Sequence, residues 1–173
     1  GSVRPAYDGL VQGLEALDAR LFDGRWNEGL RAIRENGLTF NVHGEHGLDR
    51  PYQLDPIPFV LGAEEWDEIA RGIAQRARVI NALLSDTYGT RSLLSRRLIP
   101  NGVILGHPNF LRPCFGFPVP ASARLHVYAA DLVRGPDGKF RVIADHTQTP
   151  PGAGFALENR VVVSRMLPEI FRE

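Results

Sequence analysis

The chain has 173 residues, 20 Lys and Arg against 20 Asp and Glu, and a single cysteine, Cys114. This length predicts one domain, or one domain and a small appendage, with a buried core. The balanced charge gives no overall field that would favour nucleic acid or an anionic membrane as a partner. One cysteine excludes an internal disulfide framework, and no apolar run approaches membrane-spanning length. We therefore expect a cytoplasmic protein in which Cys114 is a buried structural thiol.

Gly1 and Ser2 look like an expression scar, so residues 3–173 carry the fold. Apolar side chains at helical spacing over residues 7–21 predict an amphipathic helix, which Asp23 and Gly24 should break. Asp23 is then expected to cap a second helix that ends at Gly37.

The next segment predicts a strand, a turn and an extended stretch. Apolar and polar residues alternate over residues 38–43, residues 44–47 carry two glycines, and prolines discourage helix over residues 52–61. The turn contains His-Gly-Glu-His at residues 43–46, which could suggest zinc. It lacks the helical spacing that places two imidazoles on one face, so an exposed turn is the favoured interpretation.

The middle of the chain predicts its longest helix, with Glu64 and Glu65 in the first turn and Gly89 after the last. Its buried stripe is expected to contain Trp66, Ile69, Ile73, Ala77, Ile80 and Leu84. Arg76 lies close to this stripe and must therefore pair or extend to solvent. A short helix over residues 91–98 follows.

The rest of the chain predicts a loop, a hairpin and a helix. Residues 106–120 form a Pro-rich loop with a helical turn near Asn109. Residues 125–133 and 140–145 read as strands around a Gly-Pro-Asp-Gly turn, and a last helix covers residues 154–166.

This order of elements lacks the strict alternation of a doubly wound sheet. We expect an α+β fold with helices packed on a mostly antiparallel sheet. A helical part of about residues 3–100 would precede a hairpin–helix part of about residues 122–173.

Three polar groups are candidate sites. Asp131 on the first hairpin strand and an acid at the end of the second could hold magnesium, although a plain surface hairpin is the favoured alternative. The loop over residues 147–154, with Gln148 and Gly152, could receive an anion at the start of the last helix, or could be an ordinary helix entrance. Consecutive residues 158–160 point in different directions on that helix, so one or two of them at most could reach a ligand.

Four stretches, in this order, resemble the circularly permuted type 2 ATP-grasp family: NGLTFNVHG, AEEWDEIARGIAQRARVINALLSDTYG, HPNFLRP and YAADLVRGPDGKFRVIADHTQTPPGAGFALENR. The resemblance covers nearly the whole chain. Because family members are much longer, it implies an N-terminal portion of a circularly permuted ATP-grasp fold. It also implies an ATP-dependent amide or peptide ligase that uses ATP and Mg2+ and is similar to glutathionylspermidine synthetase in its nucleotide site.

The family hairpin carries a magnesium-binding Asp, then Glu-x-Asn on the second strand. Asp131 matches the Asp, whereas Ala144 stands in place of the Glu and His146 in place of the Asn. Asp145 should point away from the face that positions 144 and 146 share. The resemblance assigns Asp131 and His146 to the metal. It assigns Asp131, Gln148, Gly152, Asn159 and Arg160 to the nucleotide.

Alanine binds no cation, and a neutral imidazole is a poor ligand for magnesium. The ADxTQxPxG form resembles a branch of the family often fused to a helical domain called alpha-E. Three functions stay open: a ligase acting on a peptide or amine substrate, a degenerate pseudo-ligase, and an interaction module. We expect this chain to be inactive without the remainder of the ATP-grasp fold.

Overall fold

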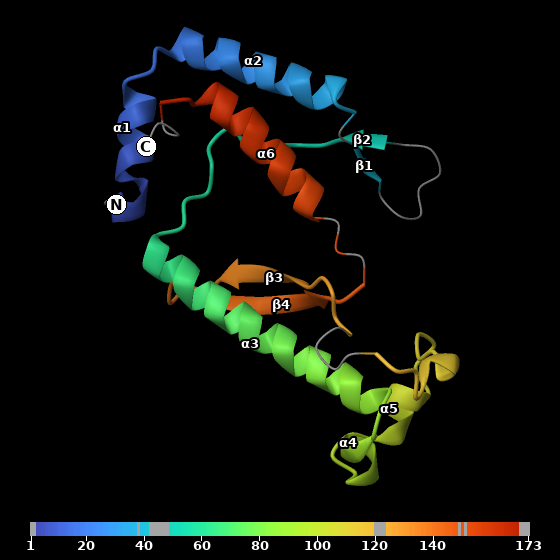
Figure 1. Ribbon diagram of the computed structural model, residues 1–173. Helices are drawn as coiled ribbons and strands as arrows, with labels where there is room; N and C mark the ends of the chain where they lie inside the picture. The colour runs from blue at the N-terminus through green and yellow to red at the C-terminus, as the bar shows by residue number, and fades with distance from the viewer. Residues whose placement is uncertain are drawn as a thin grey trace. The chain divides into compact units, whose positions relative to one another are not determined.

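A computed structural model describes residues 3–37, 39–41, 49–119, 124–148, 150 and 152–169, with the backbone alone for residues 39–41 and 49–51 (Figure 1). By its internal contacts the chain divides into two compact units, Gly1–Ala63 with Pro151–Glu173, and Glu64–Pro150. The last helix therefore joins the N-terminal helices, whereas the sequence-based division grouped it with the hairpin.

The first unit begins with the 3-10 helix η1 (Pro5–Tyr7), α1 (Asp8–Glu15) and α2 (Ala19–Glu35). The predicted break at Asp23 and Gly24 is wrong, because both residues lie inside α2. The break falls at residues 16–18, where the Asp18 carboxylate accepts hydrogen bonds from the amides of Arg20 (2.8 Å) and Leu21 (3.4 Å). Asp18 thus caps the start of α2, and an interior glycine costs too little to end an amphipathic helix.

Helix α6 (Gly152–Met166) confirms the predicted last helix and packs against α2. The core of this unit consists of apolar side chains from α1, α2 and the end of α6: Leu10, Ile33, Val162, Val163, Met166 and Leu167. Gly29 of α2 permits the close approach, because a Cβ there would lie 2.8 Å from the Met166 sulfur and 3.1 Å from Val162 Cγ1. Gly37, which follows α2, has φ +66°, the left-handed conformation expected after a helix.

Strands β1 (Thr39–Asn41) and β2 (Asp49–Pro51) form an antiparallel pair. The first lies within the predicted strand over residues 38–43, and the second was not predicted. The predicted turn at residues 44–47 and the His-Gly-Glu-His sequence at residues 43–46 lie outside the described residues. Residues 52–61 contain neither helix nor strand, as the prolines predict.

The second unit is built on α3 (Ala63–Thr87), the predicted long helix. Ile69, Ile73, Ile80 and Leu84 are half-buried as one stripe, but Trp66 is 56% exposed, so its inclusion in the stripe was wrong. Helical spacing shows which residues share a face. It does not show how far along the helix the neighbouring elements reach.

Three short elements follow α3: α4 (Ser92–Ser95), α5 (Asn101–Leu105) and the 3-10 helix η2 (Arg112–Cys114). Helix α4 occupies the middle of the predicted helix over residues 91–98. Helix α5 was missed, because five residues do not establish a period. Cys114 is exposed, so the expected buried thiol is corrected: η2 places it at the surface of its unit.

Strands β3 (Ala129–Arg134) and β4 (Phe140–His146) form the predicted antiparallel hairpin, and β3 begins four residues later than expected. The Gly138 amide donates to the Gly135 carbonyl (2.9 Å), and Gly138 has φ +80°, which explains the glycine there. The described sheets are two antiparallel pairs, so the α+β expectation is confirmed. None of the described helices is both long and apolar enough to cross a membrane.

Candidate functional site

A β-bulge sets which side chains share a face of the hairpin. Asp131 lies opposite Ala144, but the next residue, Leu132, lies opposite Val142, which leaves Ile143 as an extra residue in β4. Because directly opposed residues project to the same face, the bulge places Asp131 and Ala144 on one face and Leu132 and Val142 on the other. Bulges commonly re-aim side chains beside functional sites.

The bulge brings Asp131 and His146 together. His146 lies opposite Ala129, two residues from Asp131 along β3, and its Nε2 is 2.9 Å from Asp131 Oδ2. Both side chains are open to solvent, with 43% of His146 and 56% of Asp131 exposed. A ligand can therefore reach this pair. From the sequence we expected only that positions 144 and 146 share a face, and not that His146 contacts Asp131.

The donor set fits magnesium only in part. Asp131 supplies a hard oxygen ligand, but Ala144 directly opposite supplies nothing and His146 offers nitrogen. No group of three His, Cys, Asp or Glu side chains among the described residues is placed to hold a metal ion. The hairpin therefore contributes one suitable ligand at most, and a magnesium site would need oxygen ligands from elsewhere.

Asp145 lies on the opposite face from its two neighbours, as strand alternation predicts, and there meets α3. Arg76 donates two hydrogen bonds to its carboxylate, from Nε and Nη2 at 2.6 Å each, and the Tyr128 hydroxyl donates a third. The hydrogen bonds from Arg76, and to a lesser extent the one from Tyr128, lower the pKa of Asp145 to about 2. Arg76 thus pairs, as its position on α3 required, and the network fixes the residue that precedes His146.

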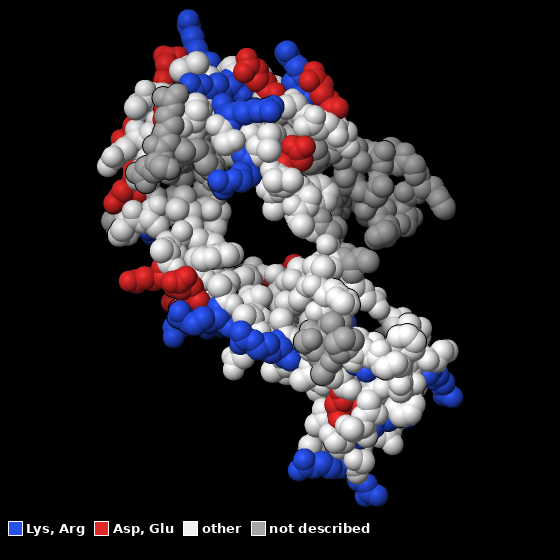
Figure 2. All heavy atoms as spheres, viewed as in Figure 1, with Lys and Arg blue, Asp and Glu red and all other residues white. Residues whose placement is uncertain are grey.

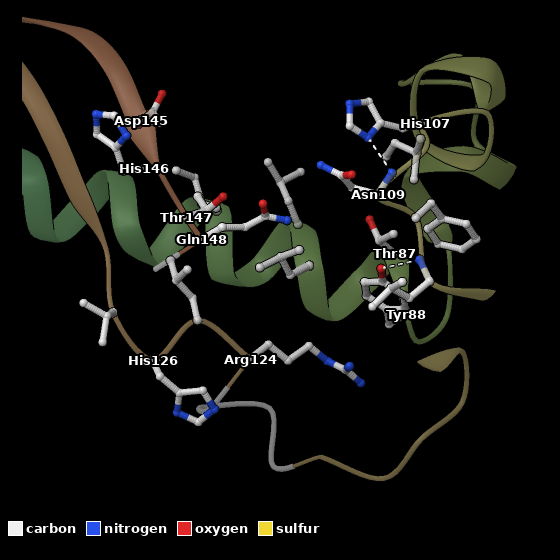
Figure 3. A pocket seen from close by; sticks show the side chains of 18 of the residues that line it. Thr87, Tyr88, His107, Asn109, Arg124, His126, Asp145, His146, Thr147 and Gln148 are labelled. Carbon is white, nitrogen blue, oxygen red and sulfur yellow. Dashed lines mark hydrogen bonds between the residues drawn. The ribbon is translucent and has the colours of Figure 1, made fainter. Parts of the chain in front are cut away.

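A groove within the second unit lies beside this network (Figure 3). Its volume is about 990 Å3, and its walls come from the second half of α3, residues 103–111, residues 124–127 and the end of β4 with the residues after it. Figure 3 shows Asp145, His146, Thr147 and Gln148 along one side of the groove and His107, Asn109 and Tyr88 along another. The nucleotide-binding candidate Gln148 therefore lines this open groove.

Three of the nucleotide candidates, Gly152, Asn159 and Arg160, belong to the first unit. Gly152 opens α6, and a Cβ on it would meet nothing within 4 Å. Asn159 donates from Nδ2 to the Tyr52 hydroxyl (2.8 Å), so part of its hydrogen-bonding capacity has a structural use. Arg160 is exposed on α6. Asp131 and His146 are assigned residues that contact each other in the described part of the chain.

Sequence reasoning missed two residues of the second unit. Tyr128 precedes β3 and supports Asp145, and Arg124 lines the groove next to the Tyr88 ring. Neither belongs to a local motif, because each meets its partners across more than fifteen residues of chain. One signal was available in the sequence: no acidic residue occurs between Asp86 and Asp131.

Comparison with known proteins shows to which family the chain belongs. The sequence model of the circularly permuted ATP-grasp type 2 family matches residues 58–173, more than half of the chain. Similar proteins include uncharacterized proteins of Mycobacterium leprae (35% identical, 99% of this chain and 30% of the relative) and Mycobacterium tuberculosis (34%, 100% and 21%). A third, from Synechocystis, is 30% identical over 99% of this chain and 36% of its own length. The chain thus spans about a fifth to a third of these relatives, and it belongs to the circularly permuted type 2 ATP-grasp family.

Proposed function

We propose that this chain is part of an ATP-dependent carboxylate–amine ligase, in which a carboxylate is activated as an acyl phosphate and passed to an amine. The supporting observation is the position of Asp131. By the resemblance it corresponds to the family's hairpin carboxylate, and in the structure it is more than half exposed and shares a face with His146 and Ala144. ATP and Mg2+ are the cofactors that the family suggests.

Each proposed residue has a limited role in this scheme. Asp131 would contribute one oxygen ligand to the cation that neutralises the phosphates, and the remaining ligands would come from other parts of the longer protein. His146 would orient Asp131 through their 2.9 Å contact. Gln148, Gly152, Asn159 and Arg160 stay candidates for nucleotide contacts. An alpha-E domain and a peptide or amine substrate are the proposed partners.

The alternative is a pseudo-ligase that binds a peptide or partner without turnover. The same hairpin favours it by one observation: Ala144 faces Asp131, and His146 already engages one carboxylate oxygen. A carboxylate left as the only hard ligand and already in contact with an imidazole is poorly prepared for magnesium. Turnover separates the two proposals.

Trapping the acyl phosphate provides the test. Full-length protein is incubated with ATP, Mg2+, hydroxylamine and a mixture of amino acids and short peptides, and hydroxamate and ADP are measured. Asp131→Asn, which keeps the size of the side chain, should lower hydroxamate formation by about a hundredfold or more, the usual cost of losing one charge-stabilising group. Asp67→Asn is the matched control, because Asp67 is an exposed acid on α3.

Two results would count against the ligase. Absence of hydroxamate from a wild-type protein that binds ATP would favour the pseudo-ligase. Turnover that survives Asp131→Asn as well as it survives Asp67→Asn would remove the hairpin from the site.

A further inference from the structure

The groove of the second unit combines an apolar floor with one positive charge. Leu84, Val103, Ile104 and Phe110 line it together with Tyr88. The Tyr88 and Phe110 rings stack with their centroids 5.3 Å apart and an interplanar angle of 15°. The hydroxyl of Tyr88 accepts a hydrogen bond from the Leu111 amide (3.2 Å), which holds the ring in place. The groove thus offers a fixed aromatic surface.

Arg124 is the positively charged side chain among the groove residues. It is half-buried, and its guanidinium carbon lies 5.9 Å from the centroid of the Tyr88 ring. The adjacent amide of Leu125 donates to Asn81 Oδ1 (2.9 Å), which fastens this segment to α3. In the described part of the chain, no carboxylate pairs with Arg124. A half-buried guanidinium on an aromatic ring is prepared to bind an anion.

The acidic side chain in the groove does not cancel this charge. Asp145 is occupied by the two Arg76 hydrogen bonds and the one from Tyr128. Between Asp86 and Asp131 the chain carries five arginines and no acid. Figure 2 shows the same bias at the end of this unit that holds α4 and α5, where blue side chains appear with little red among them. The local field therefore favours anions, although the whole chain is neutral.

We propose that this groove binds a carboxylate ligand with an apolar group, the carboxylate on Arg124 and the apolar group on the Tyr88–Phe110 stack. One guanidinium matches the planar geometry of a carboxylate through two parallel hydrogen bonds. A phosphate dianion would bind more tightly to several cationic side chains, and the groove has one arginine. Amide groups of Asn109 and Gln148 supply hydrogen bonds for a peptide-like ligand.

As a substrate subsite, this inference rests on the proposed function. His146 and Gln148 line the groove at the end of β4, so a ligand held by Arg124 would extend toward the Asp131–His146 pair. The carboxylate on Arg124 would then be a non-reacting group that positions a peptide-like substrate. Binding itself needs neither ATP nor turnover, so a failed ligase assay and a failed binding assay have different meanings.

The test uses the full-length protein without nucleotide and three probes. N-acetylphenylalanine carries the carboxylate, N-acetylphenylalanine amide is its neutral counterpart, and phenyl phosphate is the dianion. Their dissociation constants are measured by titration calorimetry or by ligand-observed NMR. The acid should bind at least about tenfold more tightly than the amide, since a hydrogen bond to a charged group contributes that much or more.

Arg124→Gln should reduce the affinity for the acid to that for the amide. Arg96→Gln is the matched control, because Arg96 is an exposed arginine of the same acid-free segment that does not line the groove. It should leave all affinities unchanged. Circular dichroism checks the fold of each variant. If Arg124→Gln does not fold, Arg124→Lys is measured in its place. Lysine keeps the charge but cannot donate two parallel hydrogen bonds, so this variant should weaken binding of the acid alone, by up to about tenfold.

Three results would overturn the proposal. These are no binding of the acid, equal binding of acid and amide, and equal losses in the variants of Arg124 and Arg96. Tighter binding of phenyl phosphate than of the acid, removed by Arg124→Gln, would show a phosphate site instead.

Discussion

At the scale of residues, single carboxylates accept hydrogen bonds from segments that no sequence motif connects to them. Asp86, at the end of α3, accepts hydrogen bonds from the amides of Ser92 (2.7 Å) and Leu93 (3.0 Å) and from the hydroxyls of Ser92 and Thr90. These amides are the first ones of α4, which has no side-chain cap from its own N-cap residue, Arg91. Asp86 therefore caps α4 from six residues away.

The charge of Asp86 should make the stability of this region depend on pH. The hydrogen bond from the Ser92 hydroxyl, followed by that from the Leu93 amide, lowers the pKa of Asp86 from its ordinary value to about 2. A group with a depressed pKa in the folded state stabilises fully above the unfolded value. That contribution disappears as the pH falls through the folded value.

Asp86→Asn should therefore lower the thermal midpoint at pH 7, and the difference from wild type should shrink as the pH falls from about 4 to 2. Scanning calorimetry over this range measures it. Asp67→Asn is the control, because Asp67 is exposed on α3. Its thermal midpoint should differ little from that of wild type at either pH. A difference for Asp86→Asn that stays constant down to pH 2 would show that its charge has no part in the cap.

At the scale of elements, α2 and α6 pack directly against each other in the first unit. Gly29 lies against Met166 and Val162, which are both 2% exposed. Gly24 lies five residues earlier in the same helix, and a Cβ there would meet nothing within 4 Å. The two glycines thus share backbone conformation and differ in packing, which makes them a matched pair.

Gly24→Ala should stabilise the protein by about 0.5–1 kcal/mol, the usual difference between glycine and alanine inside a helix. Gly29→Ala gains the same propensity but overpacks a buried contact, which costs about 1–3 kcal/mol. The free energy of unfolding, measured with urea, should therefore be lower for Gly29→Ala than for Gly24→Ala. Equal stabilisation by both changes would mean that α2 and α6 are less closely packed than described.

Long elements could be predicted from the sequence because their patterns repeat. The helix at residues 63–87 and the last helix each extend over several turns, and the Gly-Pro-Asp-Gly turn fixes the hairpin locally. The start of α2 could not be placed correctly, because Asp18 and Asp23 are equally good caps in isolation. The bulge at Ile143 has no local signal, and it decides which hairpin side chains meet.

At the scale of the whole molecule, the family is established over most of the chain, whereas the site depends on individual contacts. The family match and the relatives cover most or all of the chain. Asp131 could be named from the resemblance, whereas its contact with His146 depends on the register that the bulge sets. The groove could not be predicted, because its walls come from four separated segments. Local patterns do not encode such convergence.

The two units also bear on what this chain can do alone. Asp131, His146 and Gln148 belong to one unit, and Gly152, Asn159 and Arg160 belong to the other. The chain covers 21% to 36% of the relatives' lengths, and the resemblance places Ala144 and His146 at positions of metal ligands. We therefore expect this chain by itself to show no tight binding of magnesium-ATP.

We propose that the hairpin belongs to the metal-dependent nucleotide site of a longer ligase. Magnesium-dependent binding of a non-hydrolysable ATP analogue, measured by calorimetry, tests it most directly. The full-length wild type, Asp131→Asn and the double variant Ala144→Glu/His146→Asn are compared. We expect that wild type binds, that Asp131→Asn binds at least about tenfold more weakly, and that the double variant binds more tightly, because its new oxygen ligands lie on the same face of the hairpin as Asp131. Unchanged binding in all three proteins would contradict it.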